Sequence, residues 1–284
     1  DAAGVRVYAL SYDEADALSD FRKAHRITYT LLSDPDSEVI RKFGILNTLI
    51  NSDDHPWYGI PYPGTYVVDR NGEITHKFFD SNLAVRVGPE QLLRALRGEA
   101  VATSSVVSEP AEPDEVVMSV FLDGESLTPT VQRDLVVSFS VPKGRHVYAE
   151  PAPEGSVAVD LSLDANDRIV QRPAERPAGE PHTLAGTRES FPVHHGAFEI
   201  RLPLTVNGRV QGDEIGASLT LSGTVRWQVC DDEVCDIPVT RSFELTVPVT
   251  KSPPVALLGE EGMALEPNAR AHFQRMTERR QHGV

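Results

Sequence analysis

The sequence predicts two domains of different class, an α/β layer domain followed by an all-β antiparallel sandwich. Residues 1–98 alternate short apolar strands with amphipathic helical segments, the order of an α/β fold. Residues 116–250 hold short strands separated by turn residues, with no helical period. Between them, residues 99–115 are rich in Ala, Ser, Val, Glu and Pro, a composition typical of a linker. Residues 251–284 form a tail.

Composition excludes several classes of function. The chain has 284 residues, of which 40% are hydrophobic and 24% charged, as in ordinary globular proteins. A formal net charge of −15 argues against binding nucleic acid and against a basic membrane-binding surface. No apolar run approaches the roughly 18 residues of a transmembrane helix. Two cysteines in a chain of this length do not make a disulfide-stabilised scaffold.

The first domain opens on residues 5–10, a short apolar run that predicts a buried strand. Because this strand begins at once, we expect an N-terminal part to be missing. Ser11 and Glu14 have the spacing of a capping box, which predicts that a helix begins there. Residues 27–32 predict a second strand. Asp34 as cap, Pro35 at the first helical position and Gly44 at the end predict a second helix.

The rest of this domain reads as a loop, a hairpin and a helix. Residues 47–63 form the loop. Residues 65–68 and 73–79 predict two strands joined by a turn at Asn71 and Gly72. A last helix starts at Pro89.

Alternating apolar residues predict the strands of the second domain. They fall at residues 116–122, 135–141, 157–163, 198–204, 219–229 and 242–250. The Pro-rich residues 172–181 are too long for a turn, and we interpret them as an insertion. In the tail, Leu265, Phe273 and Met276 have helical spacing, which predicts a docked terminal helix.

Both cysteines, Cys230 and Cys235, bracket a short acidic turn between the last two strands. If strand alternation continues to its end, Cys230 lies on the polar face near solvent. As a structural staple, a disulfide closing so small a loop contributes only about 2 kcal/mol. A metal site requires more ligands, which His194 and His195 can supply, but no spacing demands it. A redox-active pair attacked by a partner's thiolate is the third interpretation.

Residues 141–148 and 225–238 resemble the N-terminal, immunoglobulin-like domain of the thiol:disulfide interchange proteins of the DsbD and ScsB kind. In that family the late cysteine pair passes reducing equivalents from a membrane domain to periplasmic thioredoxin-like proteins. The resemblance therefore implies that Cys230 and Cys235 are catalytic. It also implies a thioredoxin-like or membrane interchange partner and a periplasmic or otherwise extracytoplasmic location.

Residues 31–36, 43–45 and 63–72 resemble the redoxin branch of the thioredoxin superfamily, which includes the peroxiredoxins of the AhpC/TSA kind. The resemblance implies a thioredoxin-like fold that lacks its N-terminal catalytic segment. It also implies that Pro63 is a cis-proline that, with Gly64 and Thr65, binds a substrate chain, with Trp57 near the same site. The family's catalytic cysteine is absent, since no cysteine precedes Cys230. Proline rather than arginine at position 63 favours disulfide exchange over peroxide reduction.

We therefore expect a thiol–disulfide oxidoreductase that transfers electrons through Cys230 and Cys235. We expect no cofactor, no metal, no nucleic acid and no membrane insertion of this chain. One alternative is a thiol peroxidase whose catalytic cysteine lies upstream of this chain. The other is a non-catalytic binding module with a structural disulfide.

Overall fold

The computed structural model describes residues 4–50, 57–81, 83–97, 102–108, 115–183, 188–207 and 216–250. The chain divides into two compact units between Gly64 and Thr65. Each unit is described by itself below.

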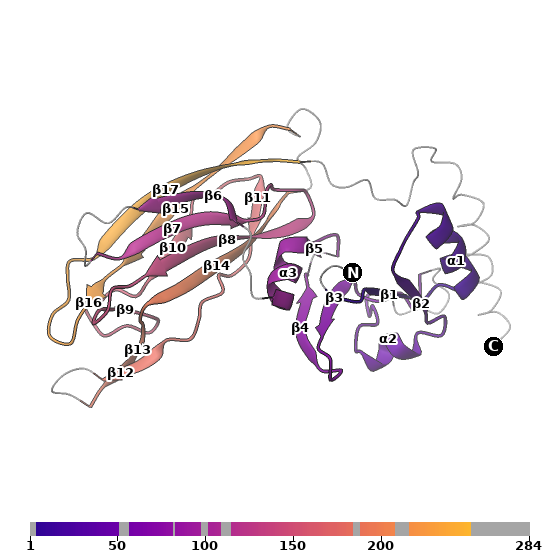
Figure 1. Ribbon diagram of the computed structural model, residues 1–284, viewed down its shortest axis with the longest axis horizontal. Coiled ribbons are helices and arrows are strands. Elements are labelled where there is room, and N and C mark those ends of the chain that lie inside the picture. Colours follow the sequence, from indigo (N-terminus) through magenta and orange to yellow (C-terminus); the bar gives the residue numbers. More distant parts are fainter. Residues whose placement is uncertain are drawn as a thin grey trace. The chain divides into compact units, whose positions relative to one another are not determined.

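The first unit is a small α/β assembly (Figure 1). Its elements are β1 (Tyr8–Ser11), α1 (Ala15–Ala24), β2 (Thr30–Ser33) and α2 (Glu38–Lys42), and β1 pairs with β2 in parallel. Its core is centred on Ile40, which is fully buried, and on Tyr12. Both predicted strands and both predicted helices are present, each displaced by a few residues.

Three details of this unit differ from expectation. The Ser11 hydroxyl donates to the carboxylate of Asp13, and α1 starts from Glu14 without a side-chain cap, so the capping box was wrong because Ser11 lies too far before the helix. β1 is not buried, since Tyr8 is 55% exposed and β1 pairs with β2 alone among the described strands. Ser37, not Asp34, precedes α2, although Asp34 still accepts a hydrogen bond from the Ile40 amide at 2.8 Å.

The second unit begins with elements predicted for the first domain. β3 (Gly64–Val68) and β4 (Ile74–Phe79) pair through a turn in which the Gly72 amide donates to the Asp69 carbonyl, which confirms the Asn-Gly hairpin. β5 (Arg86–Val87) and α3 (Pro89–Arg97) follow. β5 pairs in parallel with a strand of the sandwich, so the end of the first predicted domain is built into the second unit.

An antiparallel β-sandwich makes up most of the second unit, as predicted. One sheet has the order β11-β14-β8-β7-β6, with β5 joined to β8, and a second has the order β10-β15-β17. A third, β12-β13-β9-β16, is formed by short strands. The bounds are β6 (Ala102–Ser108), β7 (Val117–Asp123), β8 (Val131–Ser140), β9 (His146–Tyr148), β10 (Asp160–Leu163), β11 (Ile169–Gln171), β12 (Glu180–Thr183), β13 (Ser190–His194), β14 (Ala197–Val206), β15 (Ser218–Trp227), β16 (Val229–Cys230) and β17 (Val239–Pro248).

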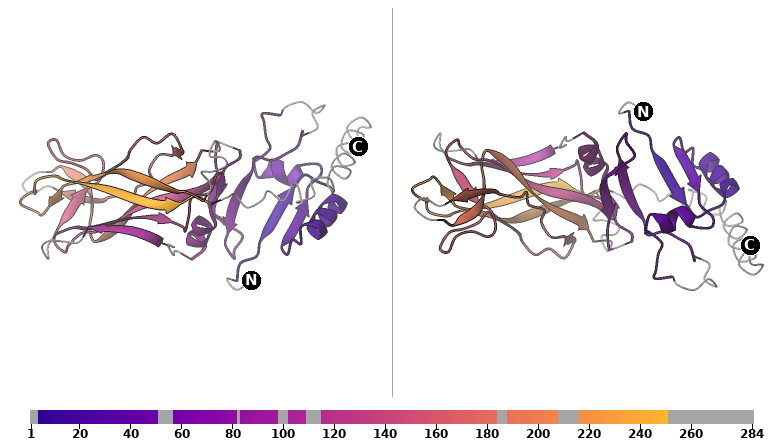
Figure 2. Two further views of the ribbon diagram at one scale, coloured as in Figure 1. Left: turned by 90° about the horizontal axis from the view of Figure 1, so that it is seen from above. Right: turned by 90° about the horizontal axis from the view of Figure 1, so that it is seen from below.

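The core of the sandwich lies between its sheets. Alternate residues of the long strands point inward, as the period of two requires. The fully buried members include Val120, Leu127, Leu135, Val137, Val147, Ile200, Leu204 and Val225. The adjacent β15 and β17, drawn in orange and yellow, run side by side along the sandwich in both views of Figure 2.

One segment departs from the predicted linker. Ala102–Ser108 forms β6 and pairs antiparallel with β7. Its composition resembles a linker, but a run of Ser and β-branched Val is compatible with an edge strand once a partner is available. The predicted tail helix lies outside the described residues.

The small sheet β12-β13-β9-β16 lies at one end of the sandwich, and β5 and α3 lie at the other (Figure 1). No helix among the described residues has the length and apolar character to span a membrane.

Candidate functional site

The two cysteines form a disulfide, with an S–S distance of 2.03 Å and 4.0 Å between their Cα atoms. Cys230 ends the two-residue strand β16, and Cys235 lies five residues further on, beyond the acidic turn. The predicted arrangement of a cysteine pair bracketing a turn is therefore confirmed.

The two cysteines differ sharply in their exposure to solvent. Cys230 is fully buried, whereas Cys235 is exposed. The expectation that Cys230 lies near solvent was wrong. Strand alternation stops at Trp227, where β15 ends, and β16 then joins a different sheet by pairing with β9. The Cys230 side chain packs instead in a small cluster with Tyr148 and Val193.

The acidic turn between Cys230 and Cys235 is ordered by hydrogen bonds among its own residues. Asp231 Oδ1 accepts from the amides of Glu233 and Val234, each at 2.8 Å, and these bonds hold the pKa of Asp231 below its usual value. The Asp236 amide donates to the Val229 carbonyl at 2.8 Å. Such a turn keeps its carboxylate ionised while leaving Cys235 at the surface.

Arg145 and Gln228 attach this turn to the sandwich. The Arg145 guanidinium forms an ion pair with Asp236 and lies 3.6 Å from Asp231. Gln228, which is 7% exposed, donates to the Asp236 carbonyl at 2.9 Å and accepts from the Val157 amide at 2.8 Å. The cation offsets the carboxylates, which by themselves disfavour a thiolate.

Three histidines gather beside the disulfide, which the sequence did not predict. The ring centroid of His146 lies 4.4 Å from that of His182 and 5.8 Å from that of His195. These residues come from β9, from β12 and from the residue after β13. His146 is far from the other two in the sequence, and the available signal was only that each lies in or beside a short strand.

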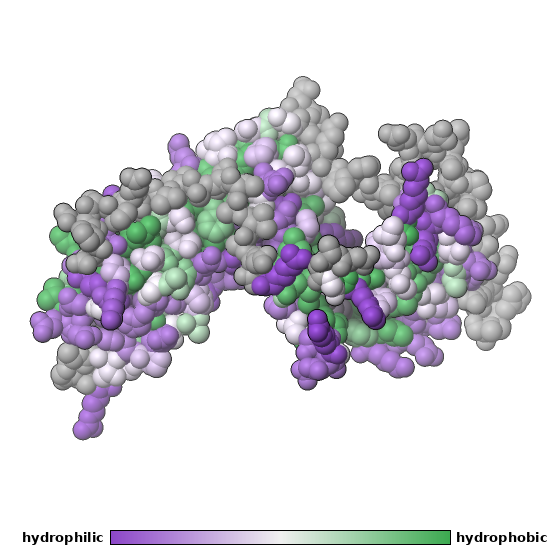
Figure 3. Space-filling model, viewed as in Figure 1, coloured by the Kyte–Doolittle hydropathy of each residue, from purple (hydrophilic) through white to green (hydrophobic). Residues whose placement is uncertain are grey.

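Two apolar side chains flank the exposed cysteine. Val234 is 63% exposed and Ile237 is 86% exposed. Figure 3 shows hydrophobic residues among hydrophilic ones at the end of the sandwich that carries this sheet. These two side chains leave apolar surface beside Cys235.

The predicted substrate-binding residues are far from the two cysteines in the sequence. Trp57 is 52% exposed and sits in a turn. Pro63 leads into Gly64 and Thr65, which begin β3. Among the described residues only the Glu150–Pro151 bond is cis, so Pro63 follows a trans bond, contrary to expectation. Trans is the lower-energy form of an X–Pro bond by about 0.5–1 kcal/mol.

The metal site considered from the sequence requires further ligands close to the cysteines. No group of three or more His, Cys, Asp or Glu side chains there has a geometry that would hold a metal ion. His194 does not join the His146 cluster; its ring stacks on Phe198 at 4.3 Å, and burial lowers its pKa.

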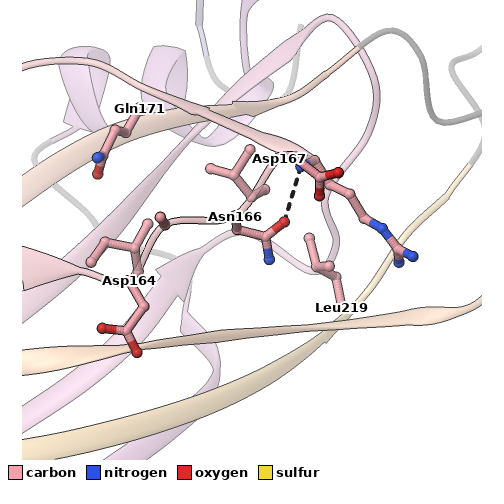
Figure 4. Close-up of a pocket in the computed structure, with 9 residues that line it drawn as sticks. Asp164, Asn166, Asp167, Gln171 and Leu219 are labelled. Atoms are coloured by element: carbon pink, nitrogen blue, oxygen red, sulfur yellow. Dashed lines mark hydrogen bonds between the residues drawn. The ribbon is translucent and has the colours of Figure 1, made fainter.

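A hollow opens elsewhere, beside the turn between β10 and β11 (Figure 4). Asp164, Asp167 and Leu219 line it, and Asn166 Oδ1 accepts a hydrogen bond from the Arg168 amide at 3.0 Å. Neither cysteine nor any histidine of the cluster lines this hollow. The disulfide therefore remains the candidate site.

Comparison with known families agrees with this chemistry. Residues 1–77 match the AhpC/TSA family, and residues 120–247 match the family described as thiol:disulfide interchange protein DsbD, N-terminal. The chain thus joins a segment similar to the first family to a segment similar to the second. Both resemblances drawn from the sequence are thus confirmed, and the disulfide lies within the second match.

Individual relatives cover the fusion only in part. Peroxiredoxin Bcp of Escherichia coli (strain K12) is 33% identical over 82 residues, 28% of this chain and 49% of the relative. Peroxiredoxin Q of Oryza sativa subsp. japonica is 31% identical over 74 residues, 26% of this chain and 31% of the relative. The chain therefore spans about half or less of the length of these relatives.

Two solved structures were also found. The Neisseria meningitidis DsbD N-terminal domain in the reduced form has a TM-score of 0.32 and 16% identity, and covers 49% of this chain and 90% of its own. The N-terminal periplasmic domain of ScsB from Proteus mirabilis has a TM-score of 0.34 and 13% identity, and covers 59% of each chain.

Proposed function

We propose that this protein is a thiol–disulfide oxidoreductase that carries electrons through the Cys230–Cys235 pair. The observation that carries the proposal is the unequal exposure of the two cysteines, with Cys230 buried and Cys235 at the surface. Exposed disulfides are more readily attacked and exchanged, whereas structural disulfides typically resist reduction. Closing a loop this small also contributes only about 2 kcal/mol to stability.

Exposure decides which residue an incoming thiolate reaches. The partner's thiolate attacks Cys235 Sγ, the new S–S bond forms there, and the Cys230–Cys235 bond breaks with its electron pair on Cys230. A second thiolate of the partner then attacks the partner's own sulfur in the mixed disulfide. Cys235 leaves as a thiolate, so two thiols are produced here and one disulfide in the partner.

The surface around Cys235 suits a protein partner. Val234 and Ile237 offer apolar contact, and the turn carries Asp231, Asp232 and Glu233. We propose a thioredoxin-like protein or a membrane thiol:disulfide interchange protein, because a low-pKa cysteine in the partner supplies the attacking thiolate. A disulfide of this kind persists in oxidising compartments, so we place the protein in the periplasm or another extracytoplasmic space.

The AhpC/TSA-type segment has a separate proposed role. It contains no cysteine in this chain. Gly64 and Thr65 begin β3 directly after Pro63, and Trp57 is exposed. We propose that these four residues contribute to binding the chain of an exchange partner. Substituting Trp57 by Ala tests this, since it should weaken partner binding without changing the reduction potential of the disulfide.

The reduction potential of the Cys230–Cys235 pair tests the proposed function. The protein is equilibrated in glutathione and dithiothreitol buffers, alkylated and weighed by mass spectrometry. A carrier has a potential between about −180 and −270 mV, the range of exchanging oxidoreductases. A potential below about −300 mV identifies a structural disulfide and rejects the carrier function.

Trapping supplies the second half of the test. Cys230→Ser leaves Cys235 free to hold a partner as a stable mixed disulfide, whereas Cys235→Ser removes the attacked atom. The remaining thiol of each variant is first treated with dithiobis(nitrobenzoate) to give a thionitrobenzoate mixed disulfide. A reduced thioredoxin-type probe with a single active-site cysteine then attacks it and releases thionitrobenzoate, and we expect the protein–probe mixed disulfide only in Cys230→Ser. Equal trapping by both variants would contradict the assignment of Cys235.

The peroxiredoxin relatives favour a second candidate function. In it, the disulfide pair regenerates a peroxide-reducing thiol that lies outside this chain. Peroxide consumption by a protein that carries such a thiol, lost when Cys230 and Cys235 are both Ser, is the result that supports it.

A further inference from the structure

His146 lies directly opposite Cys230. The two residues are Cα partners in the antiparallel pair β9–β16. Side chains that face each other across such a pair project to the same side of the sheet, with Cβ atoms about 4.5–5.5 Å apart. His146 is 2% exposed and Cys230 is fully buried. The imidazole and the buried sulfur therefore share one enclosed space.

The imidazole has an unused nitrogen in that space. His146 Nε2 is buried and has no hydrogen-bond partner within the part of the chain that the structure describes. The ring packs edge-on against Tyr148, with 5.4 Å between the centroids. A buried polar atom without a partner is destabilising, so its presence next to a sulfur that changes state calls for a functional explanation.

The neighbouring histidines connect His146 to solvent. His146 is buried, His182 is half-buried and His195 is exposed. His195 Nδ1 donates to the Arg145 carbonyl at 3.2 Å, and His182 Nε2 lies 3.9 Å from Asp232. The three imidazoles thus increase in exposure from His146, opposite Cys230, to His195 at the surface.

The charges around His146 decide its protonation. Burial, and then the nearby His182 and His195, lower the pKa of His146 to about 4, against smaller opposing effects of Asp232 and Asp231. Arg145 precedes it on the chain, Tyr148 follows on β9, and His194 on β13 pairs with the intervening Val147. The imidazole is therefore neutral at pH 7 in the oxidised protein. Negative charge that develops on Cys230 in the reduced pair raises the pKa of the neighbouring imidazole and so favours transfer of the thiol proton to it.

We propose that His146 accepts the proton of the Cys230 thiol when the reduced pair passes its electrons on, and that His182 and His195 carry this proton to solvent. The inference rests on the proposed function. In the step concerned, Cys235 is joined to an acceptor sulfur as a mixed disulfide. Cys230 Sγ gives its proton to His146 and attacks Cys235 Sγ. The internal disulfide forms, and the acceptor sulfur leaves with the electron pair and takes a proton from water.

Ring closure with glutathione disulfide isolates this step. Reduced protein is mixed with glutathione disulfide, quenched in acid at intervals, and weighed to follow the glutathione adduct and its conversion to the internal disulfide. The rate of conversion is measured from pH 5.5 to pH 9 for the wild type, His146→Phe and His146→Gln. His76→Gln, at an exposed histidine on β4, is the matched control.

We expect both His146 variants to lose rate selectively at low pH. Without a neighbouring base, the thiolate fraction falls tenfold for each pH unit below a thiol pKa of about 8.5. The variants should therefore close at least about tenfold more slowly than the wild type at pH 6, and approach the wild-type rate at pH 9. His76→Gln should follow the wild type throughout.

A pH profile for His146→Phe and His146→Gln that parallels the wild type overturns the proposal. A uniform loss at every pH also overturns it, because a merely structural residue gives that result. The proposed function fails separately, through a reduction potential outside the exchanging range given above. Ring closure with a small disulfide can be measured whatever that potential proves to be, so the two failures are distinguishable.

Discussion

Arg94 on helix α3 and Asp134 on strand β8 form an ion pair, with 2.9 Å between Nη2 and Oδ2. Asp134 is 1% exposed, and Gln91 donates a hydrogen bond to its other oxygen at 2.5 Å. Burial raises the pKa of Asp134, and the opposing effect of Arg94 only partly restores it. Helix α3, the last helix of the first predicted domain, is thus attached to the sandwich through a buried carboxylate whose desolvation is unfavourable.

Arg94→Met should destabilise the second unit. The substitution leaves the Asp134 carboxylate buried without its ion-pair partner. Breaking a fully buried pair in this way typically costs about 3–5 kcal/mol of stability. Because Arg94 is 21% exposed, we expect about 2–3 kcal/mol, measured by urea unfolding. Lys23→Met breaks an exposed pair with Asp20 and should cost less than about 1 kcal/mol. Equal losses in the two variants would show that α3 is not held by this pair.

Alkylation of single-thiol variants should report the asymmetry of the disulfide. Cys235 is exposed and Cys230 buried, and access limits the reaction of a thiol. We expect iodoacetamide to modify Cys230→Ser, which retains Cys235, at least about tenfold faster than Cys235→Ser. Mass spectrometry at short times gives both rates, and the difference should vanish in urea. Similar rates in the native protein would indicate that Cys230 is reached from solvent.

Oxidised protein should lose stability in acid through His146. Its pKa is lowered from 6.5 to about 4, so the fold favours the neutral imidazole. The contribution of His146 is therefore complete above pH 6.5 and is lost as the pH falls to about 4, by up to about 3 kcal/mol. His146→Gln should show a smaller decrease over this interval than the wild type. Parallel curves for the two proteins in urea unfolding at pH 7, 5.5 and 4.5 would refute this.

Gly223→Ala should destabilise the sandwich. A Cβ on Gly223 would lie 2.3 Å from the Ser162 carbonyl oxygen and 2.9 Å from Phe243 Cζ, on the two strands that flank β15. Overpacking of this kind typically costs about 1–3 kcal/mol. The neighbouring Ser222→Ala is the control and should unfold near the wild-type urea concentration. If the urea midpoint of Gly223→Ala matched that of the control, β10 and β17 would be able to move away from β15 without loss of stability.

Strong alternation made the long strands predictable. Alternation predicted a strand at residues 198–204, and in β14 the alternate residues Ile200, Leu202 and Leu204 are buried. The short strands β9, β11, β12 and β13 were not predicted, because three to five residues, some of them proline, give no period to detect. They pair over long distances in the sequence, so only the assembled fold defines them.

The local features of the candidate site were predictable, whereas those that depend on strand pairing were not. The cysteine pair and its acidic turn are local, and the sequence placed them correctly. The burial of Cys230 depends on β16 leaving the sheet of β15, which alternation within one strand cannot reveal. The cluster of His146, His182 and His195 depends on three strand pairings, of which the sequence showed none.

The parallel pairing of β5 with β8 bears on how the protein should be cut for expression. A gene fragment that begins at residue 116, where composition places the boundary, removes β5, α3 and β6. It strips a strand neighbour from β7 and takes Gln91 and Arg94 away from Asp134. A fragment that begins at Thr65 retains all of these partners. The domain suited to calorimetry and crystallisation therefore starts inside residues 1–77, the segment that matches the AhpC/TSA family.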